Sequence, residues 1–433
     1  MLLHRKYHRR HRYPRSALAA GAFFALAALV WLVAGVPTFV KYPTDLDATP
    51  RYEGTFTVLV DAATAAPLAE PMELPLTVER HIESLGGDVE VAGGSSGATR
   101  VVVRETIDLR AGDVLAATHT SQYVMDRSTL ENVEDDRAFA YDDTNVVDRS
   151  DAYRVNLPFD TQGDETYEIY QNEIEDTYEM VPDDDSTVTE VEGLEVETFT
   201  ANKTEAPLSE TYLATLNEMV PLPESLTLDQ LQPHLLAAGI DVPAVTAALA
   251  PVLTPEDAAA YAEFAGQPIG LEYVMSFTGQ AAIEPVTGAQ VKVDVTSESV
   301  GARPVLNDLP ALQEILSHYP EVPEAATTSG ALDELATAPA IPLFEYSYSQ
   351  TPASVAEVAD MTRDMRREVL MAKAWLPLGL AAAALLSLVV GLVVFLRRRP
   401  RPLDLSSLYE RHPAPRPTSE ERERELVTSG QKS

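Results

Sequence analysis

The sequence contains no cysteine. Disulfide bonds, thiolate zinc sites and cysteine nucleophiles are therefore excluded, and an exported domain would have to be stabilised by its core alone. Basic residues are also scarce, because 32 Lys and Arg stand against 67 Asp and Glu, which gives a net charge of −35. A surface of that sign repels nucleic acid, so we expect no nucleic-acid partner.

Motifs for catalysis or metal binding are missing as well. The histidines between residues 41 and 374 are scattered, without His-x-His or His-Glu-x-x-His spacing; they are His81, His119, His234 and His318. No glycine-rich loop of the kind that cradles phosphate is present either. The sequence therefore predicts no enzyme, and we expect no catalytic residues, no cofactor and no metal site.

Two long runs carry no charged residue, residues 17–40 and 375–396. At ~1.5 Å per residue, each is long enough to cross a hydrocarbon core of ~30 Å as a helix. The first run could instead be a cleaved signal peptide, but the apolar region of such a peptide is usually only ~7–15 residues long. We expect two transmembrane helices, which small residues such as Gly21 and Gly379 would allow to pack closely.

Basic residues near the ends of these runs predict their orientation. Six precede the first run: Arg5, Lys6, Arg9, Arg10, Arg12 and Arg15. The second run has basic residues on both sides, so the first run decides the orientation; they are Arg363, Arg366, Arg367 and Lys373 before it and arginines 397–399 and 401 after it. Because basic flanks stay inside, we expect both termini to be cytoplasmic and the protein to lie in the plasma membrane. Residues 1–16 would form a basic cytoplasmic N-terminus, residues 397–433 a disordered cytoplasmic tail, and residues 41–374 an extracytoplasmic domain.

The extracytoplasmic region reads as mainly β. Alternating apolar and polar residues predict strands over 52–60, 76–82, 99–109, 271–278, 289–295 and 343–348. Residues 205–266 instead show helical spacing cut by prolines, with Thr254 placed to cap a helix that begins at Pro255. The predicted fold class is α+β: a large β-rich ectodomain with a helical insertion, flanked by two transmembrane helices. Since both spans would enter the same membrane, its first and last strands should be neighbours.

The helical insertion is rich in apolar residues but consists of helices too short to be stable alone. Two interpretations remain open. The helices could complete the core, or they could form a mobile cap over an apolar opening. The residues that would line such a cap are Leu213, Leu216, Met219, Leu231, Leu235 and Leu236.

Acidic and aromatic residues gather between residues 123 and 178. Clustered carboxylates can coordinate calcium, which takes 6–8 oxygen ligands. The spacing of a calcium loop with its central glycine is absent, so acidic loops and hairpin turns explain the stretch equally simply.

Several segments together resemble a known family: residues 123–130, 142–149 and 153–159, with the turn Glu284-Pro285-Val286-Thr287-Gly288 and the two flanking spans. The chain resembles an actinobacterial family of PorA-like porins. This resemblance implies a membrane protein and brings no catalytic residues. The layout is also similar to that of scavenger-receptor class B proteins, which move lipids through a tunnel in a β-rich ectodomain.

These observations lead to two hypotheses for function. The first is a cell-envelope protein whose ectodomain binds or passes a lipid-like or apolar ligand. The alternative is an envelope scaffold or receptor, without transport, that recognises wall polymer or a protein partner. An apolar cavity inside the β domain would favour the first, and a filled core would favour the second.

Overall fold

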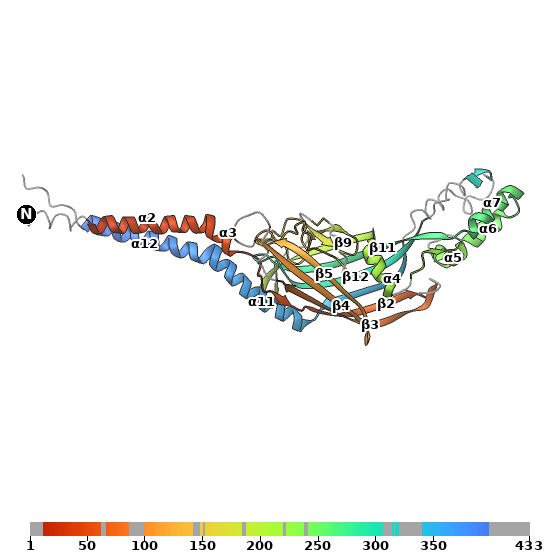
Figure 1. The fold of residues 1–433 in the computed structure, drawn as a ribbon, viewed down its shortest axis with the longest axis horizontal. Coiled ribbons are helices and arrows are strands. Elements are labelled where there is room, and N and C mark those ends of the chain that lie inside the picture. The colour runs from red at the N-terminus through yellow and green to blue at the C-terminus, as the bar shows by residue number, and fades with distance from the viewer. Residues whose placement is uncertain are drawn as a thin grey trace, which may run out of the picture. The chain divides into compact units, whose positions relative to one another are not determined.

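The computed structural model (Figure 1) describes residues 12–61, 66–85, 99–141, 148–149, 152–183, 188–219, 222–237, 241–305, 314–315, 317–319 and 340–397. It separates into two compact units. One comprises residues 1–33 and 375–433 and contains the apolar helices; the other comprises residues 34–374 and contains the β domain.

Two helices are long and apolar enough to cross a membrane, Ala19–Phe39 and Pro352–Arg397. Within the first unit, α2 (Arg12–Val30) packs against α12 (Leu376–Arg397). A Cβ atom on Gly21 would lie 3.0 Å from Leu388 Cγ, whereas one on Gly379 would meet open space. Close packing through small residues is therefore found at Gly21 and not at Gly379.

The β domain is one antiparallel sheet whose strands follow the order β5-β4-β3-β2-β13-β12-β11-β9-β7-β6, with three short strands at its margins. The long strands are β2 (Arg51–Val60), β3 (Pro67–Ser84), β4 (Arg100–Ala111), β5 (Val114–Asp126), β6 (Tyr167–Gln171), β7 (Asp176–Pro182), β9 (Leu194–Pro207), β11 (Ile269–Glu284), β12 (Ala289–Val305) and β13 (Ile341–Gln350). The marginal strands are β1 (Asp47–Ala48), β8 (Thr189–Val191) and β10 (Ser225–Leu226).

The two edges of this curled sheet are joined by irregular segments. On the β5 edge, Met125 forms a bridge with Asn132, and on the β6 edge Ile169 forms one with Tyr153. Between these segments, the Asn132 amide donates to the Ala152 carbonyl at 2.9 Å. The sheet therefore closes on itself, and its inward side chains face one another across an interior.

The helical insertion follows β9 and precedes β11. It contains α4 (Glu210–Met219), α5 (Leu228–Ala237), α6 (Val242–Leu249) and α7 (Pro255–Gly266), and Thr254 accepts a hydrogen bond from Asp257 N as the predicted cap of α7. Figure 1 shows α5–α7 beyond the ends of β11 and β12, away from α11 (Pro352–Leu370). The coarse expectation of a β-rich domain with helices and two apolar spans is confirmed.

The predicted neighbourhood of the first and last long strands is also confirmed, because β2 and β13 pair directly from Tyr52↔Gln350 to Val58↔Phe344. At the centre of this pairing, Gly54 lies against Ser347 and Tyr348. A Cβ atom at Gly54 would fall 1.8 Å from the Ser347 carbonyl oxygen. Glycine is required here by close approach of the backbones, and not by an unusual φ angle.

We expect Gly54→Val to destabilise the β domain by ~1–3 kcal/mol or more, because the clash is with backbone that cannot rotate away. The matched control is Gly270→Val in β11, where an added Cβ meets nothing within 4 Å. Thermal unfolding of the full chain measures both variants. Equal unfolding temperatures for the two would contradict the close approach of β2 to β13.

Candidate functional site

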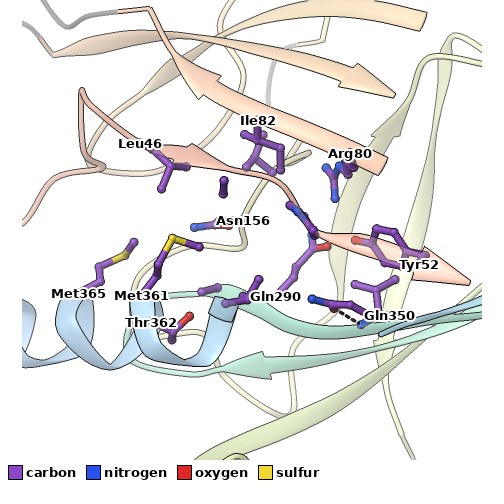
Figure 2. A pocket seen from close by; sticks show the side chains of 16 residues that line it. Leu46, Tyr52, Arg80, Ile82, Asn156, Gln290, Gln350, Met361, Thr362 and Met365 are labelled. Carbon is purple, nitrogen blue, oxygen red and sulfur yellow. Dashed lines mark hydrogen bonds between the residues drawn. The ribbon is translucent and has the colours of Figure 1, made fainter. Parts of the chain in front are cut away.

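A cavity lies beneath α11, at the end of the sheet where that helix crosses β12 and β2 (Figure 2). It encloses about 590 Å³, including space open to solvent. Its lining is mostly apolar and comes from residues far apart in the sequence: Leu46, Ala48, Pro50, Tyr52, Arg80, Ile82, Val155, Asn156, Ala289, Gln290, Val293, Gln350, Val358, Met361, Thr362 and Met365. We call it the outer cavity.

The position of α11 over this cavity is fixed at its first turn. Thr351 caps the helix by accepting from Ser354 N, and Pro352 stands at its first helical position. Ser354 Oγ in turn accepts from the Arg51 amide at 3.0 Å and from Gln350 Nε2 at 3.2 Å. The start of α11 is thereby tied to the start of β2.

Further along α11, Arg366 forms an ion pair at 3.2 Å with Glu284, which is fully buried. Glu284 also accepts from Thr287 N and Oγ1 in the β11–β12 turn that the sequence singled out. The helix is therefore anchored at two points, and Val358, Met361 and Met365 are directed over the cavity between sheet and helix.

A second cavity, the inner cavity, lies inside the closed sheet and encloses about 800 Å³, including space open to solvent. It shares Tyr52, Arg80, Gln290 and Val293 with the outer cavity, so the two adjoin. Its remaining lining is more polar: Val78, Ile107, Arg154, Gln171, Glu173, Tyr178, Phe277, Val295, Glu298 and Tyr348. Polarity therefore increases from the outer cavity to the inner one.

Behind the shared wall, two arginines converge on one buried carboxylate. Glu105 forms an ion pair with Arg80 and accepts from Arg154 Nε at 3.3 Å and from the Tyr123 hydroxyl at 2.8 Å. Burial would raise the pKa of Glu105, but the charges of Arg154 and Arg80 outweigh it and lower the pKa to about 2. Glu105 remains ionised and holds both guanidinium groups in place.

A different carboxyl group in the inner cavity is held in its neutral form. Burial raises the pKa of Glu298 to about 8, and repulsion from Glu173 adds to the rise. The Tyr346 hydroxyl donates to Glu298 Oε1, and Tyr348 lies 3.4 Å from the other oxygen. At neutral pH the wall of the inner cavity therefore carries a protonated Glu298.

The residues predicted to form a ligand cap fall into separate clusters. Leu213 and Leu216 of α4 pack on the sheet, near Tyr273 and Val300 respectively. Leu231 and Leu235 of α5 lie in another cluster around Leu249, Phe264 and Ile269. Leu236 is 56% exposed, and the side chain of Met219 lies outside the described residues. None of the five whose side chains are described lines the outer or the inner cavity, so the role of the six as a cap stays a prediction.

Two acids of the stretch 135–165 form ion pairs within the part of the chain that the structure describes. Asp135 pairs with Arg137 and Arg100, and Asp160 pairs with Lys373. Asp142, Asp143 and Asp151 lie outside the described residues. Among the residues that are described, no three His, Cys, Asp or Glu side chains are grouped so as to hold a metal ion.

Sequence reasoning missed the residues of both cavities and the buried Glu105 beside them, although a signal exists for Arg80 and for Glu105. Arg80 is in phase with Leu76, Val78 and Ile82, and Glu105 is in phase with Val101, Val103 and Ile107. A charged residue in the apolar phase of a strand is placed inward by the period of two.

The raised pKa of Glu298 predicts a specific pH dependence. Since the folded pKa of about 8 lies above the ordinary pKa of 4.5, the contribution of Glu298 to stability is complete below pH 4.5 and is lost as pH rises through 8. Glu298→Gln should therefore become more stable relative to wild type between pH 5 and 9, by ~1–4 kcal/mol. Thermal unfolding across this range, with exposed Glu53→Gln as control, measures it; parallel curves for Glu298→Gln and wild type would contradict it.

Comparison with known proteins gives one assignment. No curated protein matches the chain. The model of the porin PorA family matches residues 14–393, from α2 to the last turn of α12. This span includes both apolar helices and the entire β domain with its two cavities. The chain therefore belongs to the porin PorA family.

Proposed function

We propose that this is a two-pass membrane protein of the cell envelope whose β domain lies outside the cytoplasm and binds or passes on a lipid-like ligand. The supporting observation is the outer cavity under α11, which is lined mainly by apolar side chains and adjoins a cavity inside the closed sheet. Apolar surface exposed in a cavity favours an apolar occupant by about 25 cal/mol per Å² buried.

The position of the outer cavity along the chain supports exchange with a bilayer. Leu46 lies only seven residues beyond the end of the first apolar helix at Phe39, and Met365 lies eleven residues before α12 begins at Leu376. At ~3.3–3.6 Å per extended residue, Leu46 can be no further than about 25 Å from the end of that helix. Residues that line the cavity therefore lie close to both apolar segments along the chain.

The proposed orientation rests on the basic residues before α2 and after α12, which favour the cytoplasmic side. Of the two tryptophans, Trp375 begins the second apolar run at its outer end, and Trp31 lies eight residues before the outer end of the first helix at Phe39. Because α2 and α12 are antiparallel with Gly21 opposite Ala384 and Leu388, both tryptophans fall at the same end of the helix pair. Tryptophan is enriched at membrane–water interfaces.

The role we propose is binding or transfer without catalysis. The rival role is that of an envelope scaffold or receptor for wall polymer or a protein partner, and it would leave the cavities without a lipid. Because apolar helices carry lipid in either role, the lipid that depends on the outer cavity distinguishes the two roles.

We expect the full chain, purified from its native membrane, to retain lipid that mass spectrometry detects. Met361→Trp, which fills the outer cavity from α11, should reduce the lipid several-fold because the bulky ring occupies its place. The matched control is Asp364→Trp on the same helix, whose aspartate side chain is 83% exposed. Lipid-free wild-type protein, or equal loss in both variants, would contradict the binding role.

The orientation is tested in the natural cysteine-free background with Ser96→Cys and Ser429→Cys, one in the β domain's sequence and one in the C-terminal tail. An impermeant thiol reagent on intact cells should label only the first. Labelling of Ser429→Cys alone would reverse the proposed topology.

A further inference from the structure

The outer cavity has one charged side chain in its lining. Of the 16 residues that line it, only Arg80 is charged at neutral pH; the rest are apolar, amide, hydroxyl or phenol groups. This stands out in a chain with twice as many acidic as basic residues. A cationic group inside an apolar cavity favours an occupant that carries a negative charge.

The acidic partner of Arg80 lies outside the cavity lining. Glu105 lines neither cavity, is 1% exposed, and is shared between Arg80 and Arg154. Arg154 lines the inner cavity only, where it also faces Glu173, so the donors that meet the outer cavity are those of Arg80. The guanidinium of Arg80 has five N–H donors, and its described partners are Glu105 and Tyr52, which leaves donor capacity for a ligand.

Other carboxyl groups lie deeper. Glu173 and Glu298 line the inner cavity only, whereas Arg80 lines both. An occupant of the outer cavity therefore reaches Arg80 before it reaches either glutamate. Figure 2 shows Arg80 and Tyr52 at one end of the outer cavity and Leu46, Met361 and Met365 at the other. The cavity is amphipathic along its length, with its charge at the inner end.

We propose that the outer cavity is the site of an amphiphile with an anionic head, a carboxylate or phosphate that accepts hydrogen bonds from Arg80, and an apolar chain that lies along Leu46, Ile82, Met361 and Met365. This assignment rests on the proposed function and specifies the class of lipid. The apolar half of the cavity distinguishes such a ligand from a small free anion, which would leave that surface without an apolar occupant.

The test uses the full chain in nanodiscs of phosphatidylcholine. The probe is a long-chain fatty acid with a photoactivatable diazirine near its methyl end, and its neutral twin is the methyl ester. After irradiation, mass spectrometry of peptides should find the acid attached to segments containing Met361 or Met365. Labelling by the ester should be about tenfold weaker, the factor that corresponds to losing one charge-assisted hydrogen bond.

Three variants distinguish an effect of the Arg80 charge on labelling from an effect of misfolding. Arg80→Gln should reduce labelling by the acid to the level of the ester, and Arg80→Lys should retain the preference for the acid because the positive charge remains. Arg154→Gln is the matched control, since it removes the other arginine from Glu105 without altering the lining of the outer cavity. It should keep the preference. Loss of the preference in Arg154→Gln and Arg80→Gln alike would assign the effect to folding and overturn the proposal.

The remaining outcomes are also decisive. Equal labelling by acid and ester would overturn the anionic class while leaving lipid binding intact. Labelling by neither would overturn the lipid role as well. Inorganic phosphate that displaces the acid as effectively as an unlabelled fatty acid would assign the site to a small anion instead of an amphiphile.

Discussion

The pairing of β2 with β13 is the constraint on which the rest of the β domain depends. It joins the long strand that follows the first apolar helix to the strand that precedes the second. Beside it, the hydrogen bond between Arg51 and Ser354 links residues that are 303 positions apart in the sequence. The same contact sets the first turn of α11, because the Arg51 carbonyl accepts from Thr351 N and Ser354 accepts from Arg51 N. Closing the sheet here therefore also positions the helix that covers the outer cavity.

Closure explains why charged groups can be retained in the interior. An isolated buried arginine would be costly, and so would an isolated buried glutamate. Strands β3 and β4 pair in a register that sets Arg80 opposite Ile107, two pairs from Glu105, and the segment around Tyr153 brings Arg154 to the same carboxylate. Each buried charge is tolerated because its partners are held in place. Removing one partner leaves the others buried without compensation for the water they have lost, which destabilises the fold. The polar interior is thus a product of the sheet's closure.

The sequence predicted local features better than their assembly. Strand β2, the capped start of α7 and the turn after Glu284 follow from short-range patterns, and all three are present. The cavities do not follow, because they need pairings between distant strands. Glu298 illustrates the difficulty: bulges between Val295 and Glu298 and between Thr278 and Gly279 shift the phase of β12, so alternation counted from Ala289 does not place Glu298 correctly. Arg80 and Glu105, where β3 and β4 pair without a bulge, could have been identified.

Helices α5–α7 and helix α11 are held in place in different ways, and this difference determines where the cavities lie. Helices α5–α7 bury theirs against one another and against Ile269 and Ile341, at one end of the β11–β12 hairpin. At the other end, α11 is anchored by polar contacts at Ser354 and Arg366, which hold it over Ala289 and Gln290 at a distance that side chains do not fill. Apolar side chains fill the space among α5–α7, whereas two polar contacts fix α11 and a cavity persists between that helix and the sheet. That difference directs the search for a ligand to α11 and away from the helical insertion.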